Sequence, residues 1–305
     1  MIRLTIFTPT YNRARYLNRL YDSIRIQDHL NEVEWIIIDD ESTDNTKDVV
    51  NKIIRENNEK FHIIYIVQSH GGKHRAINRA VDMAKGEFFF IVDSDDYIMQ
   101  DAIKKIFNWM EPLAECDKIC AISGLKILSS GENVGNEVKL QKSKFIDASI
   151  FDRYKFGLGG DKAEVYKTSL IKNHKFPEFK GEMFITENVC WDAIAADGYK
   201  IRWYNEPIYV CDYLPDGLTR SGANKFEGHR KNFKGYSYYI VQCMKVIPIR
   251  SRMAYFIDYY KTTKKMGLSV KESAKNLHMN LVKYGMYIIL GNLCEIIKRI
   301  KVVLK

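Results

Sequence analysis

The chain lacks long hydrophobic runs and paired cysteines. None of its 305 residues falls in a run of about 18 apolar residues, so no membrane-spanning helix is predicted. The apolar start, Leu4 to Phe7, is too short for a signal peptide. The six cysteines form no CxxC pair, which argues against a zinc ribbon or a thioredoxin-type site. These absences predict a cytoplasmic protein with reduced thiols, unless one end adheres to the inner face of the cell membrane.

Two common nucleotide-binding fingerprints are also missing. No GxGxxG follows the first predicted strand, which disfavours the usual dinucleotide fold, and the absence of GxxxxGK[ST] excludes a P-loop. There is no internal repeat and no low-complexity segment. If the chain binds a nucleotide, the phosphate charge must therefore be met by a metal ion and by basic side chains.

Acidic residues are scarce in the last quarter of the chain. From Lys225 to the end, 17 lysines and arginines stand against 4 acidic residues, a net charge of +13. Since the whole chain carries +9, the first 224 residues carry −4. This asymmetry predicts that the tail meets an anionic partner.

The first hundred residues alternate between buried strands and amphipathic helices. Strands are predicted at 3–7, 34–39, 61–67 and 88–92, and helices at 13–27, 43–57 and 73–84. This order predicts an α/β fold with a doubly wound, mostly parallel sheet and flanking helices. A helix at 102–110 and strands at 118–128 and 198–213 are expected to complete a domain of residues 1–224. Residues 225–305 are predicted to form a basic, helical C-terminal region.

Three carboxylates stand at the end of the fourth strand. Residues 88–98 read FFFIVDSDDYI, so Asp93, Ser94, Asp95 and Asp96 directly follow a buried run. Carboxylates this close repel one another unless something positive lies among them. Asp-x-Asp offers the hard oxygen ligands that Mg²⁺ and Mn²⁺ prefer. The motif thus predicts a metal site that bridges two phosphates of a nucleotide.

Polar signatures also end the first two strands, as TPTYNR (8–13) and DDESTDNT (39–46). Ligands of open parallel sheets bind at the carboxyl ends of the strands, so all three motifs are expected at one edge. Each motif alone is equally well explained as a helix cap or a turn. The helix before strand four opens with Lys73, His74, Arg75 and Arg79, which either meet phosphate charge or form a solvated face.

The segments TIFTPTYNR, WIIIDDESTDNT and GKHRAINRAVDMAKGEFFFIVDSDD, in this order, resemble the nucleotide-sugar half of a family 2 glycosyltransferase with the GT-A fold. The resemblance is dense over residues 3–98 and looser to about residue 220. It is to enzymes of the bacterial surface-polysaccharide type. It implies metal-dependent, inverting transfer of a sugar from a UDP-sugar to a hydroxyl of a cell-surface polysaccharide or lipid-linked glycan, with Mn²⁺ or Mg²⁺ as cofactor.

The resemblance also implies roles for single residues. Asp93 and Asp95 form the metal-binding pair, with Asp95 the more direct ligand, and Asp39 or Asp40 binds the base. The segment GDKAEVYK (160–167) resembles the part that holds the donor sugar and the acceptor. The residues implied at the nucleotide-sugar site are Thr8, Pro9, Tyr11, Arg13, Asp39, Asp40, Lys73, Arg75, Asp93, Ser94 and Asp96.

The position of the acceptor-activating carboxylate departs from the family pattern. Many members carry Glu-Asp there, and the Asp is usually taken as the base, whereas this chain has Glu187-Asn188. Since Asn cannot accept a proton at neutral pH, the catalytic base becomes Glu187 or, as second choice, Asp192. A simpler interpretation of Glu187 is a carboxylate that stabilises a helix N-terminus.

The tail carries an apolar face among its basic residues. Leu293, Ile296, Ile297, Ile300 and Leu304 share one side of a predicted helix. This face predicts an interfacial helix on an anionic bilayer, a helix packed on the catalytic domain, or a homodimer contact. No nucleic-acid-binding signature accompanies it, so no nucleic acid partner is expected.

Two other functions remain as alternatives. Asn188 leaves open a binding or scaffolding subunit with the same fold and no turnover. A haloacid-dehalogenase-like phosphatase also places DxD after a buried strand, but Tyr97 stands where such enzymes normally have Thr or Val. The motif also follows the fourth strand rather than the first, so the phosphatase is disfavoured.

Overall fold

The computed structural model describes residues 1–113, 116–137, 143–212 and 225–303, and the chain divides into two compact units. The first unit consists of Met1–Phe176 with Ile194–Leu214, and the second of Pro177–Ala193 with Pro215–Lys305. The sequence predicts a first domain of residues 1–224, which includes residues 177–193. In the structure, residues 177–193 group with the C-terminal helices.

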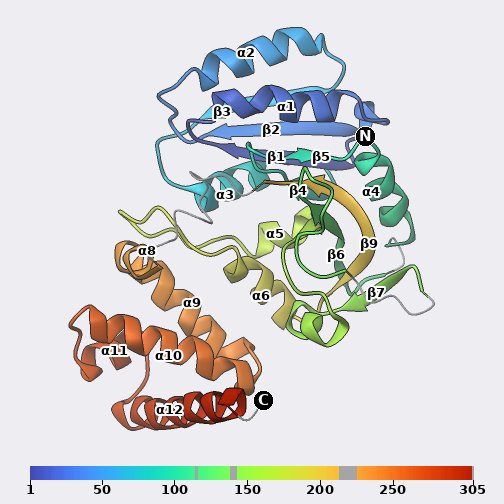
Figure 1. Cartoon of the computed structure of the whole chain (residues 1–305). Coiled ribbons are helices and arrows are strands. Elements are labelled where there is room, and N and C mark those ends of the chain that lie inside the picture. Colours follow the sequence, from blue (N-terminus) through green and yellow to red (C-terminus); the bar gives the residue numbers. More distant parts are fainter. Residues whose placement is uncertain (114–115, 138–142, 213–224, 304–305) are drawn as a thin grey trace. The chain divides into compact units, whose positions relative to one another are not determined.

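A nine-stranded sheet forms the first unit within the described residues, in the order β3-β2-β1-β4-β8-β6-β9-β5, with β7 paired to β9 (Figure 1). The strands are β1 Leu4–Thr10, β2 Val33–Asp39, β3 His62–Val67, β4 Phe88–Ile91, β5 Tyr97–Ile98, β6 Ile119–Ile127, β7 Phe145–Ala148, β8 Lys162–Lys167 and β9 Lys200–Val210. The helices outside the C-terminal region are α1 Ala14–Arg25, α2 Thr46–Asn57, α3 Lys73–Met83, α4 Ala102–Met110, α5 Thr168–Asn173 and α6 Asn188–Ala196.

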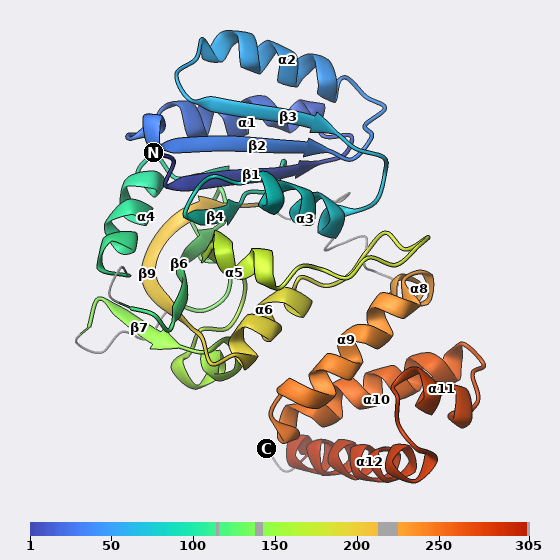
Figure 2. The same cartoon turned by 180° about the vertical axis from the view of Figure 1, so that it is seen from behind.

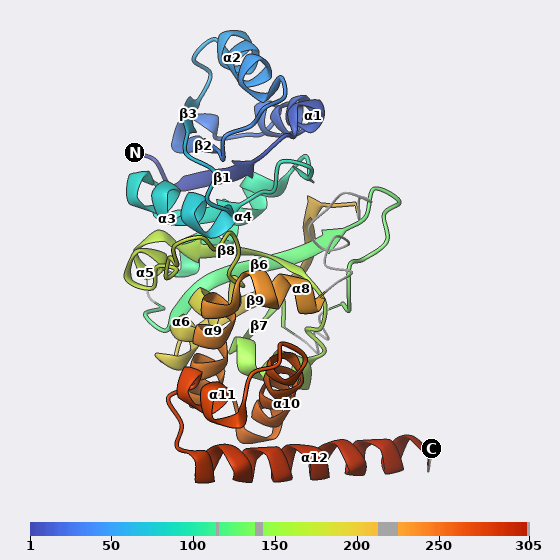
Figure 3. The ribbon, with the colours of Figure 1, turned by 90° about the vertical axis from the view of Figure 1, so that its left-hand side faces the viewer.

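The first four strands run parallel, as the sequence predicts. β1 pairs with β2 and β4, and β2 pairs with β3, all in parallel. Every residue of β2 is buried, because helices cover both faces of this part of the sheet. Helices α1 and α2 pack together on one face, and α3 packs with α5 on the other (Figures 2 and 3).

The rest of the sheet is mixed. β8 is antiparallel to both β4 and β6, β6 pairs with β9 in parallel, and β5 and β7 are antiparallel to β9. The long strand β9 curves around this half of the sheet (Figure 1). Register shifts between β6 and β9 accompany the curvature. The parallel strand pairing expected from the sequence is therefore found mainly among β1 to β4.

The second unit is helical, as the tail composition predicts. Its helices are α8 Lys225–Lys231, α9 Phe233–Val246, α10 Ile249–Lys265, α11 Val270–Asn276 and α12 Leu281–Val303. Segment 177–193 joins it through Glu182, whose two carboxylate oxygens accept the backbone N–H groups of Lys234 and Gly235 at 2.7 and 2.8 Å. A carboxylate at this position caps the N-terminus of α9. Among the described residues, no helix combines the length and apolar character needed to span a membrane.

Candidate functional site

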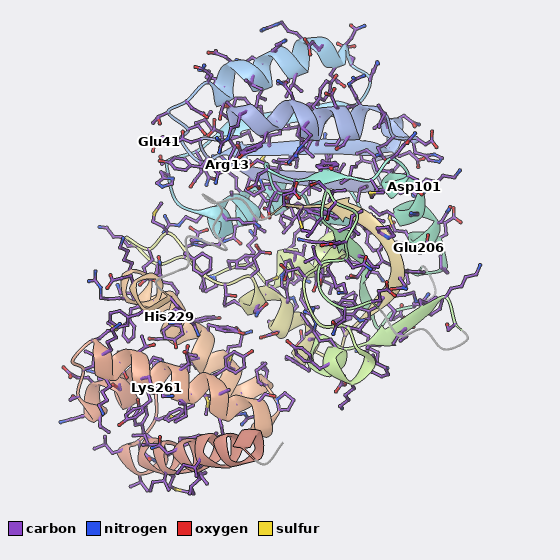
Figure 4. All side chains as sticks on the ribbon, in the orientation of Figure 1. Arg13, Glu41, Asp101, Glu206, His229 and Lys261 are labelled. Carbon is purple, nitrogen blue, oxygen red and sulfur yellow. The ribbon has the colours of Figure 1, made fainter. Side chains whose placement is uncertain are left out.

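The polar motifs that follow β1, β2 and β4 lie at one edge of the sheet. The last residues of β1 and β2, Thr10 and Asp39, are register partners. β4 continues beside β1, since Val92 donates its N–H to the carbonyl of Phe7 at 2.8 Å. Figure 4 labels Arg13 and Glu41 at this edge, where β1 and β2 end, and Asp101 away from it. The structure thus brings the three predicted motifs together.

Hydrogen bonds join the motif after β2 to the loop after β1. Asn12, in a left-handed backbone conformation, accepts the N–H groups of Thr43 and Asp44 at 2.7 and 3.2 Å through its side-chain oxygen. Asp44 in turn accepts the N–H of Ala14, the first residue of α1, at 3.1 Å. These bonds satisfy helix-end and turn donors that would otherwise lack partners. Asp44 therefore acts as a helix cap, which is the alternative interpretation of this motif that the sequence allowed.

The carboxylates of Asp39 and Asp40 differ in their remaining hydrogen-bonding capacity. Asp39 accepts the N–H of Ser42 at 2.8 Å and the hydroxyl of Tyr65 at 2.6 Å. Asp40 accepts Gln68 Nε2 at 2.8 Å and the N–H groups of Gly71 and Gly72 at 2.9 and 2.8 Å. In addition, His70 Nδ1 lies 2.9 Å from Asp40 Oδ2. Since a carboxylate offers about four acceptor positions, Asp40 has more of them occupied than Asp39, and both residues are buried.

An exposed aromatic pair lies beside Asp40. The rings of Tyr11 and His70 stack with centroids 4.3 Å apart and planes 23° apart, and Tyr11 is exposed. A flat aromatic face of this kind suits stacking by a nucleobase. Sequence analysis singled out Tyr11 but missed His70. By contrast, Thr8 is fully buried and its hydroxyl accepts the indole N–H of Trp35 at 2.9 Å, so its side chain supports the sheet.

Basic side chains reach the site from α3 and from the loop after β1. Helix α3 starts after Gly72, whose φ of 90° favours glycine, and Lys73 Nζ lies 2.6 Å from Asp93 Oδ1. A Cβ atom built on Gly71 would lie 2.8 Å from Arg75 Cδ, so the half-buried Arg75 packs closely against this glycine. Arg13 Nε lies 4.0 Å from Asp95 Oδ2. Lys73 and Arg13 therefore bring positive charge to the acidic motif.

The acidic motif alternates between accessible and buried side chains. Asp93 and Asp95 have 35% and 21% of their side-chain surface exposed. Ser94 and Asp96 are buried. The hydroxyl of the buried Tyr209, on β9, donates to Asp96 Oδ2 at 2.6 Å and accepts the N–H of Asp93 at 3.0 Å. One tyrosine thereby ties both ends of the acidic loop to β9.

Electrostatics distinguish the three carboxylates. Burial, together with the charge of Asp93, raises the pKa of Asp95 and raises that of Asp96 to about 7. Burial alone favours the neutral form of Asp93, but the charges of Lys73 and Lys126 outweigh it and hold its pKa below the ordinary value. The two accessible carboxylates therefore lie close enough to repel each other, as the sequence suggested.

Asp93 and Asp95 fit a divalent cation of the Mg²⁺ type. Such an ion is commonly held by one or two carboxylates, while substrate phosphates and water complete the coordination. Within the part of the chain that the structure describes, no cluster of three or more Asp, Glu, His or Cys side chains could hold a metal by itself. The protein would thus supply two ligands and a nucleotide diphosphate the others.

Two further charged residues near the motif escaped sequence analysis. Lys126, near the end of β6, pairs in register with Tyr209, and its Nζ lies 4.4 Å from the centre of that ring. Burial favours the neutral form of Lys126, yet the charges of Asp93, Glu164 and Asp96 raise its pKa. Burial raises the pKa of Glu164, on β8, to about 7. Glu164 falls in the segment 160–167 that was expected to hold sugars.

The candidate bases belong to the second unit, whereas the acidic motif belongs to the first. Glu187 is half-buried just before α6, and its carbonyl accepts the N–H of Cys190 at 3.0 Å. Asp192 is buried, accepts the Tyr239 hydroxyl at 3.3 Å, and has a pKa raised by burial to about 6. Asn188 donates to the same hydroxyl at 3.3 Å. This environment gives Asp192 a structural role and leaves Glu187 as the more accessible carboxylate.

Replacing Tyr209 with Phe is expected to loosen the acidic loop. The change removes two hydrogen bonds and leaves buried Asp96 without its donor, which costs about 1–3 kcal/mol of unfolding free energy. We expect at least about a tenfold weaker binding of nucleotide with Mn²⁺, measured by calorimetry. A Tyr21→Phe variant, at another buried tyrosine, is the control. Unchanged nucleotide affinity in Tyr209→Phe would show that the loop does not depend on this tether.

Segments of the chain are similar to known glycosyltransferases. Residues 5–124 match the family model described as glycosyl transferase family 2. A GalNAc(5)-diNAcBac-PP-undecaprenol beta-1,3-glucosyltransferase from Campylobacter jejuni is 26% identical over 286 residues, 90% of this chain and 85% of that protein. The poly(ribitol-phosphate) beta-N-acetylglucosaminyltransferase TarS from Staphylococcus aureus is 36% identical over 185 residues, 58% of this chain but only 30% of the length of TarS.

Solved structures show the same fold. The crystal structure of S. aureus TarS 1–349 in complex with UDP-GlcNAc aligns with a TM-score of 0.62 and 19% identity, over 86% of this chain and 72% of that one. The mannosyltransferase PcManGT from Pyrobaculum calidifontis, in complex with GDP-Man and Mn²⁺, aligns with a TM-score of 0.53 and 16% identity, over 99% and 80%. The GT-A fold expected from the sequence is thus confirmed, and residues 5–124 carry the match to glycosyl transferase family 2.

Proposed function

We propose that the protein transfers a sugar from a UDP-sugar to a hydroxyl group of a cell-surface polysaccharide or a lipid-linked glycan. The observation that carries the proposal is the meeting of Asp93, Asp95, Lys73 and Arg13 at the carboxyl edge of the parallel strands. Such a set binds a diphosphate together with a divalent ion. The cytoplasmic location, the homodimer and the absence of a nucleic acid partner stay predictions.

The names of the relatives support this choice of donor and acceptor. The Campylobacter relative is named for glucose transfer to an undecaprenol-linked glycan, and TarS for N-acetylglucosamine transfer to poly(ribitol phosphate). TarS has been crystallised with UDP and with UDP-GlcNAc. Both acceptors belong to bacterial surface glycans. The Tyr11 and His70 rings, with the remaining acceptor positions of Asp39, provide a place for uracil.

Charge determines the roles of the residues around the diphosphate. As the bond between the anomeric carbon and the diphosphate oxygen breaks, its electron pair leaves with UDP, and negative charge grows on the phosphates. Lys73, Arg75 and Arg13 meet that charge. A divalent ion held by Asp93 and Asp95 supplies further positive charge when bound. Tyr209 and Lys126 hold the acidic loop in position and balance its charge.

The acceptor loses a proton as its oxygen forms the new bond to the anomeric carbon. Glu187 takes this proton in the proposed mechanism, because Asn188 cannot and Asp192 is buried. One displacement at the anomeric carbon, without a covalent sugar–enzyme intermediate, inverts the configuration. The relatives' names support an enzyme over the scaffold or phosphatase alternatives.

A donor screen tests the proposed function. UDP-, GDP- and CMP-sugars are each incubated with the protein and Mn²⁺, and the released nucleotide is recorded by chromatography. We expect slow hydrolysis of UDP-sugars alone, because water replaces the missing acceptor, and loss of this release after EDTA treatment. The stereochemistry of the product follows from proton NMR once an acceptor is found. If no nucleotide sugar is turned over or raises the melting temperature, with or without metal, the proposal is wrong.

A further inference from the structure

Helix α12 carries an apolar stripe that faces solvent. The stripe consists of Val282, Met286, Ile289, Leu293 and Ile296, which are 76%, 57%, 63%, 50% and 53% exposed. Their spacing of four, three, four and three residues places them on one side of the helix. The span from the first to the last is about 21 Å at the rise of an α-helix. Large exposed apolar patches of this kind mark interaction surfaces.

The opposite side of α12 fixes its orientation in the helical unit. Tyr284 is fully buried and stacks edge-on against Phe256 of α10, with ring centroids 5.0 Å apart. Gly291 lies so close to Ile257 that a Cβ atom there would come within 2.3 Å of its side chain. Figure 3 shows α10 and α11 on one side of α12 only. The stripe is therefore the outward face of a helix that is already anchored on its inner face.

The stripe shares two residues with the apolar face predicted from the sequence and extends it towards the start of α12. Leu293 and Ile296 belong to both. Ile297, Ile300 and Leu304 lie outside the described side chains, whereas Val282, Met286 and Ile289 add an N-terminal half that sequence analysis did not include.

The charge around the stripe selects the partner. Residues 225–305 carry a net +13, and α12 itself contains Lys283, Lys298, Arg299 and Lys301 against a single acidic residue, Glu295. A second copy of the chain docked through this face would bring like charges together, which is unfavourable. An anionic bilayer offers apolar depth for the stripe and charge opposite to the net positive charge of this region of the sequence.

We propose that α12 is a membrane-docking helix that lies in the plane of an anionic bilayer. The stripe enters the boundary between headgroups and acyl chains, and the basic residues contact the headgroups. This inference does not depend on the proposed function, because bilayer binding is measured without any sugar. If it is correct, binding requires both anionic lipid and the stripe, and it weakens as salt screens the charges.

Vesicle flotation with the full chain tests the proposal. We expect binding to vesicles of equal parts phosphatidylcholine and phosphatidylglycerol, and little binding to phosphatidylcholine alone. An Ile289→Ser/Leu293→Ser variant should bind at least about tenfold more weakly, since two exposed apolar side chains are lost. The matched control is Ile26→Ser/Ile54→Ser, which removes two exposed isoleucines from the first unit.

A second variant keeps the test decisive if the serine variant folds poorly. In Ile289→Trp, the emission of the new tryptophan should shift to shorter wavelength and be quenched by brominated lipid when anionic vesicles are added. Three results would overturn the proposal. The first is that the unaltered chain does not bind anionic vesicles. The second is that the serine variant binds them as tightly as the unaltered chain. The third is that the unaltered chain sediments as a dimer and the serine variant as a monomer.

Discussion

Asp95→Asn is expected to lower sugar transfer by about a hundredfold to a thousandfold while leaving the fold intact. Asp95 is partly exposed, and its ion pair with Arg13 has a distance of 4.0 Å, so loss of its charge costs little stability. The same change removes one of the two carboxylates that would hold the divalent ion against the diphosphate. Removal of one electrostatic contact to a developing charge typically costs a hundredfold to a thousandfold in rate.

The measurement is nucleotide release from the donor found in the screen, at saturating donor and Mn²⁺, with the melting temperature recorded for each variant. Asp101→Asn is the matched control, because it makes the same chemical change at an exposed residue that Figure 4 shows away from Arg13. We expect this control to retain the rate of the unaltered chain. If Asp95→Asn keeps a rate within a few-fold of that of the unaltered chain, the acidic motif takes no part in the reaction.

The parallel half of the fold could be predicted from sequence, because its signals are local. β1 to β4 are short strands rich in apolar residues, and each is separated from the next by an amphipathic helix, so parallel pairing follows general rules. β8 reads KAEVYK and gives no local sign that it inserts antiparallel between β4 and β6. Its place depends on contacts between residues far apart in the chain, which periodicity does not report.

The same contrast holds within the site. Repulsion among Asp93, Asp95 and Asp96 is evident from their adjacency alone, so the motif could be identified without a structure. Tyr209 could not, because it is 116 residues from Asp93 and lies within an ordinary buried strand. The hydrogen bonds of Asp40 could not be predicted from the sequence either, because their donors at Gly71 and Gly72 are backbone N–H groups, which every residue except proline has.

Glu187→Gln is expected to lower turnover about a hundredfold to ten-thousandfold while leaving nucleotide affinity unchanged. The range is that of general base catalysis by a positioned side chain. Gln keeps the size of Glu but cannot take a proton. Glu187 belongs to the second unit, outside the acidic motif, so binding of UDP and Mn²⁺ by calorimetry should match the unaltered chain. Loss of kcat with unchanged affinity separates a base from a binding residue.

Two further variants decide which carboxylate is the base. Asp192→Asn should keep turnover, because Asp192 is buried and bonded to Tyr239. Glu206→Gln, exposed and in the first unit, is the matched control for the chemical change. In Glu187→Gln/Asn188→Asp the carboxylate moves by one residue, to the position where many family 2 members carry Asp, and we expect part of the lost turnover to return. If Asp192→Asn is the inactive variant and Glu187→Gln the active one, Asp192 is the base despite its burial. If neither change lowers turnover, proton removal does not depend on this segment.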